Sequence, residues 1–346
     1  MTLKMRTIVA AGVAATLAWP MLATPRAQVQ KIDAEKLLAE RFGFSAAEID
    51  QARAGQAVTK LLPARETTEV GVFGAVRITG TPDRLVYWLK DIAGFRKAAE
   101  LGLSKKLSSP PQINDFADLS LGADELAALK ACRPGQCDLR LGDAAIARFQ
   151  AEVDWASPDA ATRANLLTRQ LMLSLAQAYL QGGDLALGTK HFEKTPRVSV
   201  DEFHALLYQA TNLYALARPF ADYLENFPKA SLPDTEQFLY WAHGGSGPDA
   251  SISLHQVIIS NPPGGVVLIA DKQIYASRYT DAALTIITLA SARDGNGYYA
   301  MAAARGRSTM LGGVAARLLR SRVEKASLET ATMYLNWIQQ SLAMSR

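Results

Sequence analysis

The spacing of apolar residues changes twice along the chain and predicts three regions of different secondary structure. In residues 69–78 valine and isoleucine alternate with small or polar residues, which is typical of a strand. In residues 119–243 apolar residues recur every three or four positions, which predicts a nearly all-helical region. After Gly244 short apolar runs return between turn residues, and we expect strands at 257–259, 266–270, 273–276, 284–289 and 298–302.

Capping residues indicate where the predicted helices begin and end. Residues 32–54 are expected to form two short helices broken at Gly43, with Ser45 as the N-cap of the second. Thr81 is expected to cap a helix whose first residue is Pro82. The chain ends in a predicted helix over residues 314–343, and its apolar stripe consists of Leu328, Ala331, Leu335, Ile338 and Leu342.

Three helices are predicted inside the helical region. Ser157 opens the first, which Gly182 closes. A capping box at Ser199 opens the second, and Pro219 ends it. The third and shortest is expected over residues 234–241.

The order of these elements resembles that of the START-like, polyketide-cyclase superfamily. The shared features are a strand followed by the Thr81-Pro82 helix, and a strand ending in Arg305-Gly306-Arg307 before the final helix. The resemblance covers residues 69–98 and 253–343, and the helical middle departs from it. It implies an α+β fold of the helix-grip type, in which a curved antiparallel sheet wraps around a long C-terminal helix.

The first strand is separated from the others by the helical region. Alone it would leave an unpaired edge, so we expect it to join the later sheet and the helical block to be an insertion. The chain then divides into residues 1–27 as a signal peptide, 28–68 as an N-terminal helical segment, 69–118 as the first strand and helix of the α+β domain, 119–245 as the helical insertion, and 246–346 as the antiparallel sheet with the C-terminal helix.

The N-terminus has the pattern of a secretory signal. Basic Lys4 and Arg6 precede an apolar stretch over residues 7–18, Pro20 follows it, and Ala27 is expected to be the last residue of the signal. We therefore expect a periplasmic or secreted protein, and an uncleaved membrane anchor remains open. The formal net charge of +4 falls to about +1 without this segment, because Lys4, Arg6 and Arg26 lie in it. A nearly neutral chain argues against nucleic-acid binding.

The two cysteines, Cys132 and Cys137, flank a Pro-Gly turn. In an oxidising compartment such a close pair is typical of a disulfide that fixes a turn. A redox-active pair normally has two residues between the cysteines, and here there are four.

The sequence contains no residue spacing that is typical of a catalytic, metal or cofactor site. Ser246 lies among glycines, but Pro248 occupies the position where a nucleophile elbow needs glycine. The four histidines are far apart and none has a second ligand at helical metal spacing. We expect neither a metal site nor a cofactor.

Polar residues of the predicted sheet are the candidates for ligand binding. Lys272, Tyr275 and Tyr279 lie among apolar residues, and along a flat alternating strand they would mostly face solvent. If the sheet curls, alternate side chains of its strands face a cavity, where Tyr275 with Tyr298 or Tyr299 would supply polar groups.

Arginines near the final helix form the second group of candidates. Arg305 and Arg307 are suited to a carboxylate-bearing ligand or to anionic headgroups. Membrane contact is expected through Arg317, Arg320 and Arg322, although a solvated helix start with an Arg320–Glu324 pair explains the same residues.

These observations favour an exported, non-enzymatic protein that holds a hydrophobic small molecule or lipid between the sheet and its last helix. An envelope interaction or structural protein is the first alternative, and it predicts a cavity filled by side chains. A START-like cyclase or hydrolase is the second, and it predicts a carboxylate or histidine within hydrogen-bond reach of Arg305 or Lys272 in a pocket.

Overall fold

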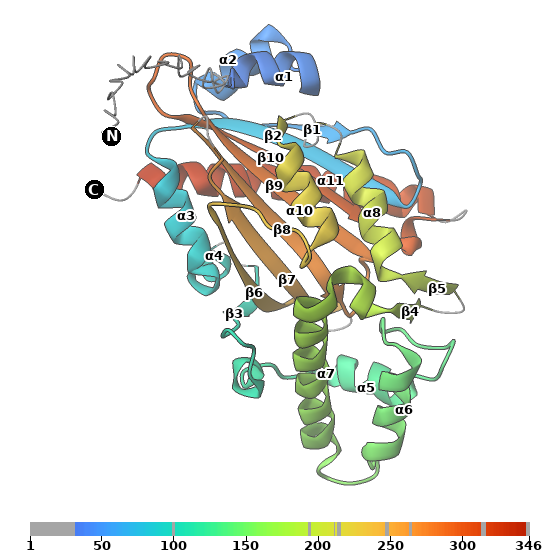
Figure 1. The fold of residues 1–346 in the computed structure, drawn as a ribbon. Coiled ribbons are helices and arrows are strands. Elements are labelled where there is room, and N and C mark those ends of the chain that lie inside the picture. The colour runs from blue at the N-terminus through green and yellow to red at the C-terminus, as the bar shows by residue number, and fades with distance from the viewer. Residues whose placement is uncertain are drawn as a thin grey trace, which may run out of the picture. The chain divides into compact units, whose positions relative to one another are not determined.

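An antiparallel sheet of eight strands forms the centre of the computed structural model (Figure 1). The model describes residues 32–98, 101–192, 195–210, 212, 216–245, 249–262, 265–312 and 316–343. The strand order is β1-β2-β10-β9-β8-β7-β6-β3, and every neighbouring pair is antiparallel. The strands are β1 (Val58–Leu62), β2 (Glu69–Ile78), β3 (Leu103–Lys106), β6 (Thr235–Gly244), β7 (Ser251–Ser260), β8 (Val266–Ala276), β9 (Ala282–Ser291) and β10 (Tyr298–Arg307).

The early strand joins the late ones, as predicted, because β2 pairs with β10 along its whole length. The two strands predicted at 266–270 and 273–276 are one strand, β8. Four short strands were not predicted: β1, β3, and the two strands of the hairpin β4 (Thr189–Phe192) and β5 (Thr195–Val198).

The helix predicted at residues 234–241 is wrong, because this segment is the strand β6. Leu239 and Trp241 are buried on one face of the sheet, whereas Tyr240 and Ala242 are buried on the other. A strand covered on both faces has a continuous apolar run, and such a run does not distinguish a strand from a buried helix.

Helices cover both faces of the sheet. On one face lie α3 (Pro82–Lys90), α4 (Ile92–Ala98) and the C-terminal α11 (Ala316–Ala343), packed on residues such as Ala300 and Ala302. On the opposite face lie α1 (Ala34–Phe42), α2 (Ala46–Arg53), α7 (Ala160–Gly182), α8 (Ser199–Gln209) and α10 (Arg218–Asn226). The neighbouring residues Tyr299 and Met301 belong to this second core, since side chains alternate along a strand.

Helix α11 crosses the outer strands β1 and β2, and the predicted C-terminal helix is confirmed. Leu335 and Ile338 of its stripe are fully buried, while Leu328 and Ala331 are half-buried. The approach is close at Gly74, where an added Cβ would lie 2.6 Å from Cδ1 of Leu335. A sheet gripping a long final helix, with helices inserted between its strands, confirms the predicted α+β, helix-grip fold.

The rest of the helical region forms its own small core beside the sheet. It consists of α5 (Ala123–Ala131), α6 (Asp143–Glu152) and the first half of α7. Cys132 and Cys137 are bonded to each other and buried in this core, which confirms the predicted disulfide. The described residues between 32 and 343 belong to one compact unit, and residues 1–31, with the predicted signal peptide, lie outside the described residues.

The predicted helix caps are confirmed in part. Gly43 ends α1 in the left-handed region at φ 62°, and Ser45 forms a capping box with Glu48. Thr81 is the N-cap residue of α3 and Pro82 is the first residue of that helix, as predicted, although the Thr81 side chain makes no capping hydrogen bond. Ser199 is the first residue of α8 and makes no capping bond, so the capping box predicted there is wrong. Helix α8 ends at Gln209, well before Pro219, which lies instead in the first turn of α10.

Glu48 connects α2 to the edge strand β1. Its carboxylate accepts a hydrogen bond from the backbone N–H of Ser45 (2.7 Å) and pairs with Nζ of Lys60 (2.9 Å). These contacts, with the Ser45 backbone bond the largest, lower the pKa of Glu48 from 4.5 to about 2.

A pH dependence follows from this shift. Because the folded pKa lies below that of the unfolded chain, the carboxylate stabilises the fold fully above pH 4.5 and loses this effect as pH falls towards about 2. We expect the difference in urea-unfolding midpoint between the unaltered protein and Glu48→Gln to shrink over that range. A difference that stays constant from neutral pH to pH about 3 would contradict the assignment.

Candidate ligand cavity

A cavity of about 430 Å³ lies between the sheet and α11. Strands β2, β8, β9 and β10 form its floor, and α3, α4 and α11 supply the other walls. Its volume falls in the range of about 300–1,000 Å³ that small-molecule sites occupy. The wall is largely apolar and includes Val72, Phe95, Ile269, Ile287, Ala304 and Val323.

The sequence dictates this apolar floor through strand alternation. Alternate residues of β9, Ala283, Thr285 and Ile287, point to the side that α11 covers. Small residues on the neighbouring β10, Ala302 and Ala304, leave space beneath the helix. The void therefore lies where small side chains on two strands face a helix that packs mainly on the next strands, β1 and β2.

Four polar side chains gather at one part of the wall: Arg96, Tyr240, Asp271 and Tyr334. The hydroxyl of Tyr240 donates to Oδ2 of Asp271 (2.6 Å), and the guanidinium of Arg96 lies 5.8 Å from the centre of the Tyr240 ring. Nη2 of Arg96 donates to the carbonyl oxygen of Leu101 (2.7 Å), but its buried Nε has no hydrogen-bond partner within the described part of the chain. A donor is thus available to an acceptor on a bound molecule.

Asp271 also belongs to a chain of hydrogen bonds that leads away from the cavity. Nδ1 of His255 lies 2.8 Å from Oδ1 of Asp271, and Nε2 of His255 lies 2.9 Å from Oγ of Ser253. Burial opposes ionisation of Asp271, but the charge and hydrogen bond of His255, with Tyr240 and Arg96, hold its pKa below the ordinary value. Asp271 therefore carries a negative charge at the cavity wall.

Lys272, the first predicted ligand residue, lies on the opposite side of the sheet from α11. It is fully buried, and its Nζ pairs with Oδ2 of Asp184 at 2.5 Å. The same nitrogen lies 3.5 Å from the centre of the Phe203 ring and 5.2 Å from that of Tyr179. Burial lowers the pKa of Lys272 although Asp184 opposes the shift. Neither member of this pair lines a described cavity.

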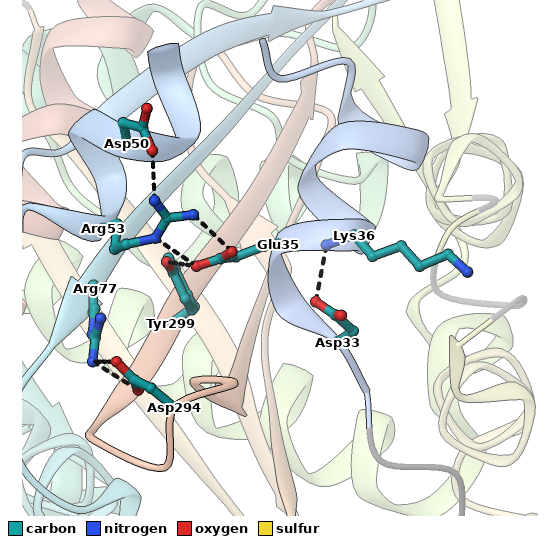
Figure 2. Close-up of polar contacts among 8 residues, drawn as sticks. All are labelled: Asp33, Glu35, Lys36, Asp50, Arg53, Arg77, Asp294 and Tyr299. Atoms are coloured by element: carbon teal, nitrogen blue, oxygen red, sulfur yellow. Dashed lines mark hydrogen bonds and ion pairs between the residues drawn. The ribbon is translucent and has the colours of Figure 1, made fainter. Parts of the chain in front are cut away.

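The three predicted tyrosines lie apart from one another. Tyr275 is buried against the helical block, where it lines a void of about 30 Å³. The hydroxyl of Tyr279 donates to Oδ1 of Asp249 (3.1 Å), in the turn after β8. That of Tyr299 donates to Oε1 of Glu35 (2.6 Å), beneath α1 (Figure 2). None of the three lines the cavity under α11.

Arg305 and Arg307 contribute to the cavity wall, and both are engaged in ion pairs. Nη1 of Arg305 pairs with the fully buried Glu69. Arg307 pairs with Glu66 and Glu202, each at 2.8 Å. The structure thus brings these two arginines to the end of the strands beside the cavity, whereas it keeps Lys272 and the tyrosines away.

The first turns of α11 carry the arginines predicted for membrane contact. Arg317 and Arg322 are exposed, and Arg320 pairs with Glu324 at 2.8 Å and donates to the carbonyl oxygen of Thr67 (2.7 Å). An apolar residue between them, Leu318, is 80% exposed.

Sequence reasoning missed Arg96, Tyr240 and Asp271. Tyr240 was assigned to a helix, and Asp271 fell between two predicted strands. Their proximity depends on the register of β6, β7 and β8, in which Tyr240 lies opposite His255 and Asp271 opposite Val257. The sequence contains no signal for that register before the strands are known.

Comparisons with known proteins give likenesses in structure but none in sequence. No protein-family model and no curated protein matches the sequence. Among solved structures, a STAR-related lipid transfer protein from Xanthomonas axonopodis (fragment 25–204) matches with a TM-score of 0.38 and 8% identity. The match covers 83% of this chain and 94% of that one. A likeness at this TM-score identifies neither the family nor the ligand of this chain.

Within the described ranges, no group of three or more His, Cys, Asp or Glu side chains has the arrangement of a metal site. None of the described helices has the length and apolar character to span a bilayer.

Proposed function

We propose that this protein is exported and binds a hydrophobic or amphipathic ligand, such as a lipid, between its sheet and α11. The observation that carries the proposal is the apolar cavity of about 430 Å³ beneath that helix. Apolar walls with a few convergent polar groups are typical of small-molecule sites. An apolar chain would lie against Ile287 and Ala304, and a polar head would accept a hydrogen bond from Arg96.

Lipid uptake with a cavity-filling variant tests this proposal. Delipidated protein is refolded, exposed to a cell extract, repurified and analysed by native mass spectrometry. Ala304→Phe places a ring in the cavity, and we expect it to lower the bound lipid by about tenfold or more, the effect of losing 1.4 kcal/mol or more of binding free energy.

Ala303→Phe is the matched control, since Ala303 is the adjacent residue on β10 and its side chain points to the other face of the sheet. This variant should retain the lipid held under α11. Protein that takes up no lipid at all, or equal uptake by the two variants, would contradict the proposal.

Contact with an anionic membrane surface is a second part of the proposal. The exposed Leu318 lies among Arg317, Arg320 and Arg322, an arrangement suited to an interface with acidic headgroups. We expect Arg317→Glu with Arg322→Glu to reduce flotation with phosphatidylglycerol vesicles and to leave the weak binding to phosphatidylcholine unchanged. Equal flotation of the altered and unaltered proteins would contradict membrane contact through these arginines.

Export is supported by the signal-like pattern of the first 27 residues. Expression of the full chain in a bacterium, followed by fractionation and N-terminal sequencing, tests it. We expect a periplasmic product that begins at Gln28, and a cytoplasmic product beginning at Met1 would contradict export.

The hydrolase alternative has one observation in its favour. The hydrogen-bonded order Ser253–His255–Asp271 has the atom pairing of a serine nucleophile, a base and an orienting acid. Only Asp271 of the three lines the cavity. Covalent labelling by a fluorophosphonate that Ser253→Ala abolishes would support a hydrolase. Absence of labelling would mean that these three hydrogen-bonded residues have a structural role only.

The first alternative, an envelope interaction protein, predicts a cavity filled by side chains, and the void under α11 counts against it.

A further inference from the structure

A second cavity, of about 330 Å³, lies on the opposite face of the sheet. Its floor is formed by β8, β9 and β10, and its walls come from α1, the β1–β2 turn and the end of α8. Phe42, Phe73, Leu284, Ile286 and Met301 make most of this surface apolar. The side chains that face it alternate with those that face the cavity under α11, so the two voids are separated by the thickness of the sheet.

Three arginines surround this second cavity: Arg41, Arg65 and Arg305. Arg41 and Arg65 are exposed, and neither forms an ion pair or a side-chain hydrogen bond with another described residue. Arg305 is held by Glu69 and by the carbonyl oxygen of Pro63. The described lining contains no aspartate or glutamate. Arg41 and Arg65 thus place positive charge, without a described counter-charge, beside an apolar void. This arrangement favours a ligand that is apolar at one end and anionic at the other.

The wall formed by α1 is fixed to the sheet by side-chain contacts (Figure 2). Glu35 of α1 accepts hydrogen bonds from Tyr299 of β10 (2.6 Å) and from Nε of Arg53 of α2 (2.9 Å). Hydrogen bonds from Arg53 and Tyr299 hold the pKa of Glu35 below its ordinary value against the effect of burial. The helix that carries Leu37, Arg41 and Phe42 is therefore positioned before any ligand binds, and a pre-organised wall costs less on binding.

We propose that this second cavity binds a single-chain amphiphile with an anionic head, its apolar chain against Phe73 and Ile286 and its head between Arg41 and Arg65. Guanidinium groups recognise carboxylate and phosphate heads through the same paired hydrogen bonds. The site is distinct from the one under α11, because it uses the other face of the sheet and because its head-binding residues, Arg41 and Arg65, do not line the cavity under α11. Arg305 lies beside both cavities.

Calorimetric titration with three twelve-carbon probes tests the class of ligand. Dodecanoate and dodecyl phosphate should each bind at this site at least about tenfold more tightly than dodecanol, because only the two anions can form charge-assisted hydrogen bonds with the guanidinium groups. The anion that binds more tightly indicates whether the preferred head group is a carboxylate or a phosphate. Equal affinities for dodecanol and both anions would overturn the proposal.

Two kinds of variant locate the binding. Arg41→Gln with Arg65→Gln should weaken dodecanoate binding about tenfold and change dodecanol binding by less than about twofold. Both residues are exposed, so the fold should not depend on them. Arg293 is an exposed residue of the β9–β10 turn, and Arg293→Gln, which removes one positive charge away from the cavity, should leave both affinities unchanged. If Arg293→Gln lowers the affinity for dodecanoate as much as the double variant does, the effect comes from net charge alone, and the proposed site is overturned.

The matched alanines of β10 then separate the two cavities. Ala303→Phe should abolish the arginine-dependent binding of dodecanoate, whereas Ala304→Phe should retain it within about twofold. Circular dichroism confirms that each variant is folded. The opposite pattern would place the amphiphile under α11 and overturn the second site, and a failure of lipid uptake under α11 would leave this result unchanged.

Discussion

Replacing Asp184 by alanine is expected to lower the free energy of unfolding by about 3–5 kcal/mol. The carboxylate of Asp184 is the partner of Lys272, whose side chain has no exposed surface and lies against the rings of Phe203 and Tyr179. Without Asp184 the ammonium group must either remain charged among apolar groups or lose its proton, and both outcomes destabilise the folded chain. Urea unfolding followed by circular dichroism measures the loss.

The double variant Asp184→Leu with Lys272→Met is the control. It removes both charges and keeps similar volumes, so most of the stability lost in Asp184→Ala should return. If the double variant is as unstable as the single one, the loss comes from packing of the segment around Asp184 and not from an uncompensated charge.

Replacing Asp281 by alanine is expected to have a similar effect, about 3–5 kcal/mol. Oδ1 of Asp281 accepts from Nε of Arg140 (2.9 Å), and Oδ2 accepts from the backbone N–H of Thr309 (2.6 Å). The side chains of Arg140 and Asp281 are 3% and 4% exposed. These bonds join three parts of the fold: the helical block, the turn between β8 and β9, and the segment that leads into α11.

Asp222→Ala is the matched comparison, since Asp222 forms an ion pair with Arg218 in which the two side chains are 45% and 74% exposed. Solvent screens such a pair, so its removal should cost less than about 1 kcal/mol. Equal losses for Asp281→Ala and Asp222→Ala would show that burial of the Arg140–Asp281 pair has no special effect on stability.

The sequence predicts much of this fold because the main elements have unambiguous periods. The stripe containing Leu335 and Ile338 is long enough to define a helix and its buried side, and both residues are fully buried. The strands after Gly244 are separated by glycine, proline, asparagine and aspartate, which interrupt helices and strands and favour turns. The sequence also predicts that β2 joins the later strands, because an isolated strand would leave its backbone groups unpaired, but it does not indicate β10 as the partner.

The ligand residues are harder to predict, because their position depends on which face of the sheet each side chain takes. Lys272 has the polarity of a ligand residue, yet on β8 its side chain points to the face of the sheet where Asp184 lies. The preceding residue, Asp271, points to the opposite face and lines the cavity. A shift of one residue exchanges the two faces of a strand. Arg96 and Tyr240 come from segments whose distance in sequence conceals their proximity.

A crystal structure of the protein purified with its bound lipid tests the central claim most directly. We expect density for an apolar chain between α11 and strands β9 and β10, with the polar head within hydrogen-bond distance of Arg96. A structure in which the lipid lies elsewhere, or in which side chains fill the space under α11, would contradict the account.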